Sequence, residues 1–229
     1  MWTNSLPPEL LNTVHCMDCL EFMKTLHDGC VDLVLTDPPY WIWMSKWTFL
    51  VNTEKKITWK RKFESHTRDD FIPSKEVFNE ILRISKNQII FWWNYFIEHL
   101  HNSRCWIVRE KKEDYRQWSN FADCELARTS FDENIRLYKF WVIWFDWLNN
   151  PQKEDKVHPT QKPVPLFKRI LENYSEQWMT VLDCFAWSWT TGVACKELGR
   201  NYILVEKEPK YVDIIHKRLQ NTTVSLFHT

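Results

Sequence analysis

The sequence predicts one α/β domain, built on a mostly parallel, seven-stranded sheet with helices on both faces. Short apolar runs alternate along the chain with segments whose apolar residues recur at helical spacing, the pattern of βα units. At 229 residues the chain is long enough for a single domain, 1–229, and too short for two of usual size. Polar turns after two apolar runs place the candidate functional residues at carboxyl ends of strands, where parallel sheets bind ligands.

Each element is predicted from its own pattern. The apolar runs expected as strands are Leu11–Cys16, Val31–Thr36, Gln88–Phe91, Cys105–Val108, Leu137–Ile143, Val181–Phe185 and Tyr202–Val205. The segments expected as helices are Cys19–Leu26, Glu76–Ile84, Pro165–Tyr174, Thr191–Leu198 and Pro209–Leu219. Asp18 is the expected N-cap of the first helix. The stretch Glu110–Asn134 is polar, charged and irregular, so we expect it to be an insertion outside the sheet core.

Charge and cysteine content exclude several classes of protein. Basic and acidic residues each number 30, so no overall positive field indicates a nucleic-acid partner and any such surface must be local. Seven scattered cysteines favour reduced thiols over a disulfide framework. Cys16 and Cys19 have no second pair at ligand spacing, so no metal is expected. The amino terminus lacks the layout of a signal peptide and no apolar run has membrane-spanning length, which predicts a cytoplasmic protein without a membrane partner.

The tetrapeptide Asp37-Pro38-Pro39-Tyr40 follows the predicted strand Val31–Thr36 and suits transfer of a group to an exocyclic amine. Such an amine on a nucleobase is a poor nucleophile because its lone pair is delocalised into the ring. Asp37 is suited to accept one amine hydrogen and the Pro38 carbonyl the other, and the two prolines fix the direction of that carbonyl. Tyr40 offers a flat face on which a flipped-out base stacks. The alternative is a proline-stiffened turn with a capping aspartate.

A second turn, Asp183-Cys184-Phe185-Ala186-Trp187-Ser188-Trp189-Thr190, joins a predicted strand to a predicted helix. Such a turn normally needs glycines, which let the backbone bend sharply and approach a nucleotide closely. Here Trp187 and Trp189 stand where those glycines are expected, and we expect their indoles to lie partly in solvent at the rim of the sheet. Glu206 ends the next predicted strand, about 20 residues on, where an acid commonly holds the hydroxyls of a ribose.

The composition extends this anomaly to the whole chain. Glycine averages about 7% of residues, so roughly 16 are expected, whereas this chain has 3 glycines and 15 tryptophans. We hypothesise that the gene reads UGA as glycine and that its UGA codons have been translated here as tryptophan. A decayed or deliberately altered gene is the alternative. The tryptophans in turn or loop contexts are Trp41, Trp43, Trp47, Trp92, Trp93, Trp118, Trp178, Trp187 and Trp189, whereas Trp106, Trp141 and Trp147 have the contexts of ordinary core tryptophans.

With glycine at 187 and 189 the second turn resembles the S-adenosylmethionine loop of amino-group DNA methyltransferases. The segment His158-Pro159-Thr160-Gln161-Lys162-Pro163 resembles the one that precedes this loop in the same family. With Asp37–Tyr40 placed first, the motifs follow the order of the β-class, circularly permuted adenine-N6 enzymes, and the resemblance covers about Asn12 to Leu219. It implies a Rossmann-like S-adenosylmethionine-dependent methyltransferase fold, that cofactor, and methylation of N6 of a flipped-out adenine.

The resemblance also implies roles for individual residues. The catalytic residues that it implies are Asp37, Pro38, Pro39 and Tyr40. The cofactor-binding residues are Asp18, Thr160, Lys162, Asp183, Phe185, Trp187, Trp189 and Glu206, with the tryptophans as departures from the glycines that the family favours. The implied partners are double-stranded DNA and a restriction endonuclease, and the range 110–150 is expected to recognise the target sequence.

A basic cluster after the first turn is a candidate for contacts to DNA phosphates. It consists of Lys55, Lys56, Lys60, Arg61 and Lys62. A solvated loop would have the same composition, so both interpretations stay open.

Two alternative functions remain open at this point. Methylation of cytosine N4 uses the same chemistry, although that family more often carries serine at the position of Asp37. A non-catalytic DNA-binding remnant, with Trp187 and Trp189 filling the cofactor pocket, is the alternative from a different class. Methylation of cytosine C5 is disfavoured, because it needs a cysteine nucleophile, usually after proline, and the chain contains no Pro-Cys dipeptide.

Overall fold

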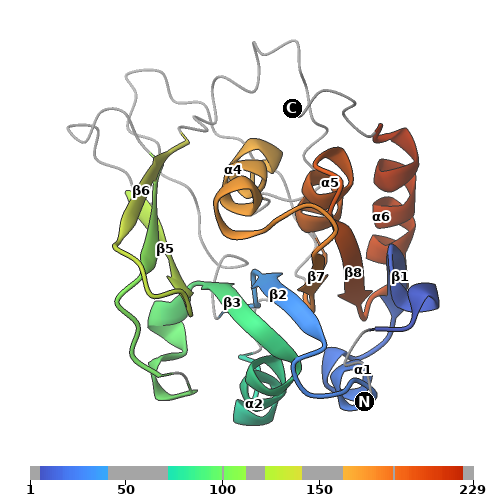
Figure 1. The fold of residues 1–229 in the computed structure, drawn as a ribbon, viewed down its shortest axis with the longest axis horizontal. Helices are drawn as coiled ribbons and strands as arrows, with labels where there is room; N and C mark the ends of the chain where they lie inside the picture. The colour runs from blue at the N-terminus through green and yellow to red at the C-terminus, as the bar shows by residue number, and fades with distance from the viewer. Residues whose placement is uncertain are drawn as a thin grey trace, which may run out of the picture.

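The computed structural model describes residues 6–40, 72–99, 101–111, 122–140, 162–187 and 189–223. Within these ranges the chain forms an eight-stranded sheet (Figure 1). Its strands are β1 (Thr13–Cys16), β2 (Val31–Thr36), β3 (Ser85–Phe91), β4 (Trp106–Glu110), β5 (Cys124–Thr129), β6 (Arg136–Lys139), β7 (Thr180–Asp183) and β8 (Asn201–Glu206). The helices are α1 (Cys19–Lys24), α2 (Lys75–Ile84), α4 (Val164–Tyr174), α5 (Thr190–Glu197) and α6 (Pro209–Asn221), with short 3-10 turns at Pro8–Leu10, Trp93–Tyr95 and Ile97–His99.

The strand order is β1-β8-β7-β2-β3-β5-β4-β6. The first five strands in this order pair in parallel, whereas β5 is antiparallel to both β3 and β4. From β2 the chain proceeds to β3 on one side, and from β7 it proceeds to β8 on the other, so the topology switches direction between β2 and β7. In open α/β sheets such a switch point leaves a crevice at the carboxyl ends of the strands. The two polar turns predicted from the sequence follow these two strands.

Helices cover both faces of the sheet, as predicted (Figure 1). Val14 of β1 is in register with Leu204 of β8, and His15 with Val205. The His15 ring lies 4.5 Å from that of Phe22 in α1, so this set of side chains faces α1. Because side chains alternate between faces, Val14 and Leu204 face the opposite layer, in which α5 and α6 pack.

One strand was missed, and its absence makes the predicted count of seven wrong. β5 lies inside the sheet between β3 and β4, so the prediction that Glu110–Asn134 lies outside the sheet core is wrong for Cys124–Thr129. The strand was overlooked because Glu125 and Arg128 interrupt its apolar pattern. Both side chains are nevertheless buried, Glu125 against Arg109 at 2.8 Å and Arg128 through a hydrogen bond from Nε to the His101 carbonyl. No helix in the described part of the chain is long and apolar enough to cross a membrane.

Candidate active site

The two polar turns meet at the carboxyl edge of β2 and β7. Thr36, the last residue of β2, donates from its hydroxyl to Asp183 Oδ1 at 2.7 Å, and Thr191 of α5 donates to Oδ2 at 2.6 Å. The Phe185 amide also donates to Oδ1, at 3.1 Å. Burial raises the pKa of Asp183 to about 6, against these hydrogen bonds, which favour the charged form. Asp183 therefore ties together the end of β2, the second turn and the start of α5.

Asp37 follows Thr36 directly and is buried. Its Oδ2 accepts a hydrogen bond from Lys162 Nζ at 2.7 Å. Its Oδ1 is also buried and has no hydrogen-bond partner among the described residues. Burial raises the pKa of Asp37, and the Lys162 ammonium opposes that rise. The site thus holds one carboxylate oxygen that is anchored and one that is available to a donor from a ligand.

Lys162 lies at the centre of this arrangement and is only 1% exposed. Its ammonium stands 5.3 Å from the Phe91 ring centroid and 5.1 Å from that of Trp92, and its carbonyl accepts a hydrogen bond from Thr190 at 3.0 Å. The family resemblance implies that the Lys162 ammonium binds the cofactor, whereas in the structure it donates a hydrogen bond to Asp37. The assignment to the cofactor therefore stays a prediction.

Tyr40 belongs to a small aromatic cluster. Its ring stacks on Trp92, with centroids 4.1 Å apart, and lies 5.1 Å from the ring of Tyr95. Trp92 follows β3, is 8% exposed and has a φ of 58°. Its Nε1 is buried without a hydrogen-bond partner in the described ranges. The indole thus covers one face of the Tyr40 ring.

The second turn differs from expectation in how its tryptophans are placed. Trp187 is 9% and Trp189 2% exposed, so the prediction that their indoles lie partly in solvent is wrong. Trp189 is the N-cap residue of α5, with φ 48°, and the Arg218 guanidinium lies 5.0 Å from its ring centroid. Burial of two apolar rings in the fold overrides the exposed position of the turn at the sheet edge.

Two acidic residues predicted to bind the cofactor lie at the carboxyl ends of the neighbouring strands β1 and β8. Asp18 follows β1 and caps α1 as predicted, accepting from the Leu20 amide at 2.9 Å. Glu206 ends the neighbouring strand β8, in register with Cys16 of β1, and is buried with Oε1 accepting from the Glu208 amide at 2.8 Å. Carboxylates at the ends of adjacent parallel strands fit the hydroxyls of a nucleoside. The buried indoles at 187 and 189 do not fit a loop whose backbone must approach that ligand.

Several predicted residues lie outside the described residues. These are Thr160, Lys55, Lys56, Lys60, Arg61, Lys62, Trp41, Trp43, Trp47, Trp118, Trp141 and Trp147. Of the range 110–150, the structure describes 110–111 and 122–140. The DNA contacts predicted for these segments stay predictions.

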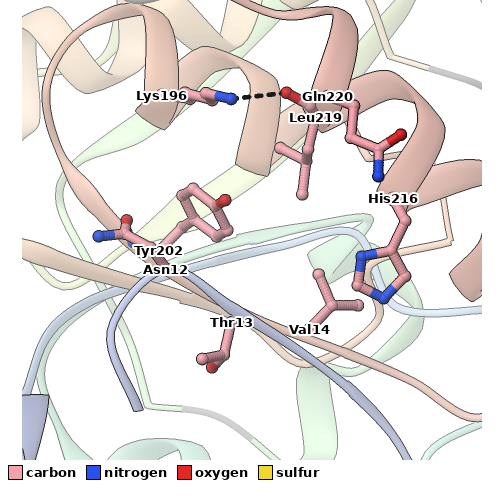
Figure 2. A pocket seen from close by; sticks show the side chains of 8 residues that line it. All are labelled: Asn12, Thr13, Val14, Lys196, Tyr202, His216, Leu219 and Gln220. Carbon is pink, nitrogen blue, oxygen red and sulfur yellow. Dashed lines mark hydrogen bonds between the residues drawn. The ribbon is translucent and has the colours of Figure 1, made fainter. Parts of the chain in front are cut away.

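A separate pocket of about 450 Å³ lies at the other end of the sheet (Figure 2). Thr13 and Tyr202, near the starts of β1 and β8, line it together with Leu219 near the end of α6. Lys196 donates from Nζ to the Leu219 carbonyl at 2.6 Å beside it. Because the pocket is at the amino ends of these strands, it is distinct from the candidate site at the carboxyl ends of the parallel strands, where Asp37 and Glu206 lie.

Sequence reasoning missed two charged residues of the site. Arg109 of β4 and Glu125 of β5 are directly opposite each other in the antiparallel ladder, and both are buried. Glu125 Oε2 is 3.9 Å from Lys162 Nζ, which connects the pair to Asp37. The signal available in the sequence was that acidic and basic residues occur within two short runs, now β4 and β5, that are otherwise largely apolar.

This geometry and the sheet order define the class of protein: the fold is that of S-adenosylmethionine-dependent methyltransferases. The solved complex of M1.HpyAVI with S-adenosylmethionine superimposes with a TM-score of 0.56, covering 90% of this chain and 98% of that one at 19% identity. TTHA0409 from Thermus thermophilus, also solved with S-adenosylmethionine, gives 0.57 with 93% and 96% coverage at 18% identity. The cytosine-N4-specific PvuII DNA methyltransferase gives 0.54, with 95% of each chain covered at 14% identity.

The family is shown by the sequence itself. The model of a family described as DNA methylase, which groups N6 and N4 enzymes, matches residues 96–217, more than half of the chain, and the chain belongs to this family. The chain is similar to the type II methyltransferase M.HinfI of Haemophilus influenzae, with 23% identity over 255 residues, 93% of this chain and 69% of that protein. It is similar to M2.MboI of Moraxella bovis, with 23% identity over 242 residues, 90% and 86% of the two chains.

Proposed function

We propose that this protein is a site-specific DNA methyltransferase of the β-class, circularly permuted type, which methylates N6 of a flipped-out adenine with S-adenosylmethionine. The observation that carries the proposal is the Asp37 carboxylate at the switch point of the sheet. One of its oxygens is fixed by Lys162 at 2.7 Å and the other is buried without a partner among the described residues. A buried acceptor without a donor is costly, so it indicates a ligand that supplies one.

The exocyclic amine of adenine supplies such a donor. Asp37 Oδ1 accepts one amine hydrogen and the Pro38 carbonyl the other, which draws electron density onto the nitrogen and orients its lone pair. S-adenosylmethionine, when bound, supplies the methyl group. We assign its nucleoside part to Asp18, two residues after the end of β1, and to Glu206, the last residue of the adjacent β8. Tyr40 stacks on the base and keeps the amine in the plane of the Asp37 and Pro38 acceptors.

Adenine is favoured over cytosine by Asp37, because the cytosine-N4 enzymes more often carry serine there. The fold does not discriminate, since a cytosine-N4 enzyme is among the similar structures. Double-stranded DNA is the proposed partner, contacted by the basic cluster Lys55 to Lys62 and recognised through the range 110–150. The relatives M.HinfI and M2.MboI are type II methyltransferases, which supports a restriction endonuclease as the functional partner.

We further propose that the active form carries glycine at many of the tryptophan positions. Trp92, Trp178 and Trp189 have φ values of 58°, 67° and 48°, in the left-handed region occupied by Gly29 and Gly199. A bulky L-residue is strained there, whereas glycine is not. Trp106 was expected to be an ordinary tryptophan. In contrast to the three above, it lies in the strand β4 and donates from Nε1 to the Ser103 carbonyl at 2.9 Å. The support for glycine thus falls on positions selected from the sequence.

The test is to express the gene with glycine at its UGA codons and to incubate the protein with unmethylated DNA and S-adenosylmethionine. Digestion of the DNA to nucleosides and mass spectrometry should detect N6-methyldeoxyadenosine. N4-methyldeoxycytidine would replace the adenine assignment by the cytosine one. If a folded protein binds DNA but forms neither product, the non-catalytic remnant is favoured. Sequencing the codons for 187 and 189 tests the recoding, which UGG codons at those positions would exclude.

A further inference from the structure

A buried cluster of charges extends from Asp37 into β4 and into β5, the strand that was predicted to lie outside the sheet core. Lys162 Nζ lies between Asp37 Oδ2, at 2.7 Å, and Glu125 Oε2, at 3.9 Å. Glu125 Oε2 also pairs with Arg109 Nη1 at 2.8 Å, and Glu125 Oε1 with Lys111 Nζ at 3.1 Å. Lys111 is 26% exposed, whereas the other four side chains are buried. The cluster therefore crosses from the end of β2 to β5 and β4.

We propose that Glu125 is a positioning residue for methyl transfer, which holds the Lys162 ammonium at Asp37 Oδ2 so that Asp37 Oδ1 stays available to the target amine. The proposal rests on the proposed function. Lys162 is fixed at its backbone by the Thr190 hydroxyl, but its long side chain needs a second anchor beyond Asp37 to keep one geometry. Glu125 supplies that anchor without touching the predicted reacting atoms.

The cluster also explains why a strand inside the sheet carries charges. Arg109 and Glu125 are a cross-strand pair in the β4–β5 ladder, so the geometry of the pair is set by the register of the sheet. Burial opposes ionisation of Glu125, but the surrounding cations hold its pKa down, to about 2. Glu125 therefore stays charged at neutral pH and offsets the excess of positive charge around Lys162. A buried ionic network of this kind is weak evidence for stability, which makes a positioning role the better account.

The charged groups around Asp37 act on it in opposite directions. Lys162, which precedes α4, and Arg109 of β4 favour its charged form, whereas Glu125 of β5 opposes it. Asp183 of β7 is a further like charge, since Asp37 contributes to the raised pKa of Asp183. Asp37 must be ionised to accept the amine hydrogen, so its pKa sets the acid limb of the rate profile. Removing Lys162 should move that limb to higher pH. Removing Glu125 takes away a like charge, which alone would lower the pKa of Asp37, but it also releases the Lys162 ammonium, whose effect on Asp37 is larger, so the limb should again move to higher pH.

The experiment uses the protein that carries glycine at its UGA codons and measures single-turnover methyl transfer between about pH 5 and pH 9. Glu125→Gln should lower the rate about 10- to 100-fold at neutral pH, because misplacing a reacting group by about 1 Å can cost that much. Its acid limb should move to higher pH, and that of Lys162→Met further in the same direction. Glu125→Asp keeps the charge, so it should keep the acid limb and lose rate. Glu197→Gln, which breaks the partly buried pair with Lys168, is the matched control and should change neither the rate nor the acid limb.

If Glu125 does not position Lys162, Glu125→Gln removes only a like charge, and its acid limb should stay in place or move to lower pH. That result, or unchanged turnover in Glu125→Gln, overturns the proposal while leaving the proposed function intact. If the parent transfers no methyl group, the proposed function fails instead. A carboxyl-carbon NMR titration of Asp37 then still decides whether loss of Glu125 raises the pKa of Asp37, as loss of Lys162 should. If Glu125→Gln does not fold, Glu125→Asp carries the rate comparison and Lys162→Met the titration.

Discussion

Position 178 offers a direct measurement of whether the backbone is shaped for glycine. Trp178 precedes β7, has a φ of 67° and is 76% exposed. Its amide donates to the Gly199 carbonyl at 3.1 Å, and its own carbonyl accepts from Asn201 at 2.8 Å, so the surrounding structure fixes this conformation. Comparing Trp178→Gly with Trp178→Ala isolates the backbone, because both variants lose the same indole.

The expected difference follows from two opposing terms. The left-handed conformation costs an L-residue about 1–2 kcal/mol, which glycine does not incur. Glycine loses about 0.4–1 kcal/mol more conformational freedom on folding than alanine does. Trp178→Gly should therefore be more stable than Trp178→Ala by about 1 kcal/mol, which corresponds to a Tm higher by about 2–4 °C for a chain of this size.

Urea denaturation followed by circular dichroism measures the two free energies of unfolding. Trp106 is the matched control, because it lies in β4 and donates to Ser103 as an ordinary tryptophan. There the order should invert, with alanine more stable than glycine by about 0.5–1 kcal/mol. If Trp178→Ala is as stable as Trp178→Gly, or if both positions give the same order, the inference that strained backbone marks the glycine positions is refuted.

Three further outcomes test the site. Asp37→Ala in the glycine-containing protein should abolish methyl transfer and leave S-adenosylmethionine affinity unchanged, because the Asp37 carboxylate contacts the amine and not the cofactor. Transfer of a radiolabelled methyl group measures the first and calorimetry the second. If Asp37→Ala keeps half of the parental turnover, Asp37 is not a catalytic residue. Trp187→Gly with Trp189→Gly should convert a protein with no measurable S-adenosylmethionine binding into one that binds, and equal binding by both proteins would contradict the loop assignment. Burial raises the pKa of Asp183 to about 6, above its unfolded value, so the folded state binds the proton more tightly and stability should fall as pH rises from about 4 to 6. Asp183→Asn should lack this part of the pH dependence in urea denaturation, and an unchanged pH slope would show that Asp183 does not cause it.

Much of the fold was predictable because its signals are local. Seven of the strands follow apolar runs, and the turns after β2 and β7 are marked by residues whose backbone or side-chain chemistry is unusual. The pattern also selected the tryptophans that stand in loops, of which Trp92, Trp178 and Trp189 have positive φ. β5 was not predictable in the same way, because its charged residues have the appearance of a surface segment until their partners are known.

The sequence by itself determined the alternation of strands and helices, the two polar turns and the excess of tryptophan, because each depends only on composition or on residues that are close together in the chain. Only the tertiary structure decided that Lys162 pairs with Asp37, 125 residues away, and that Glu125 joins them from a strand between β3 and β4. It also decided that the indoles of Trp187 and Trp189 are buried. Sheet order and register bring such residues together, and they depend on the packing of the whole chain, which no short run of residues specifies.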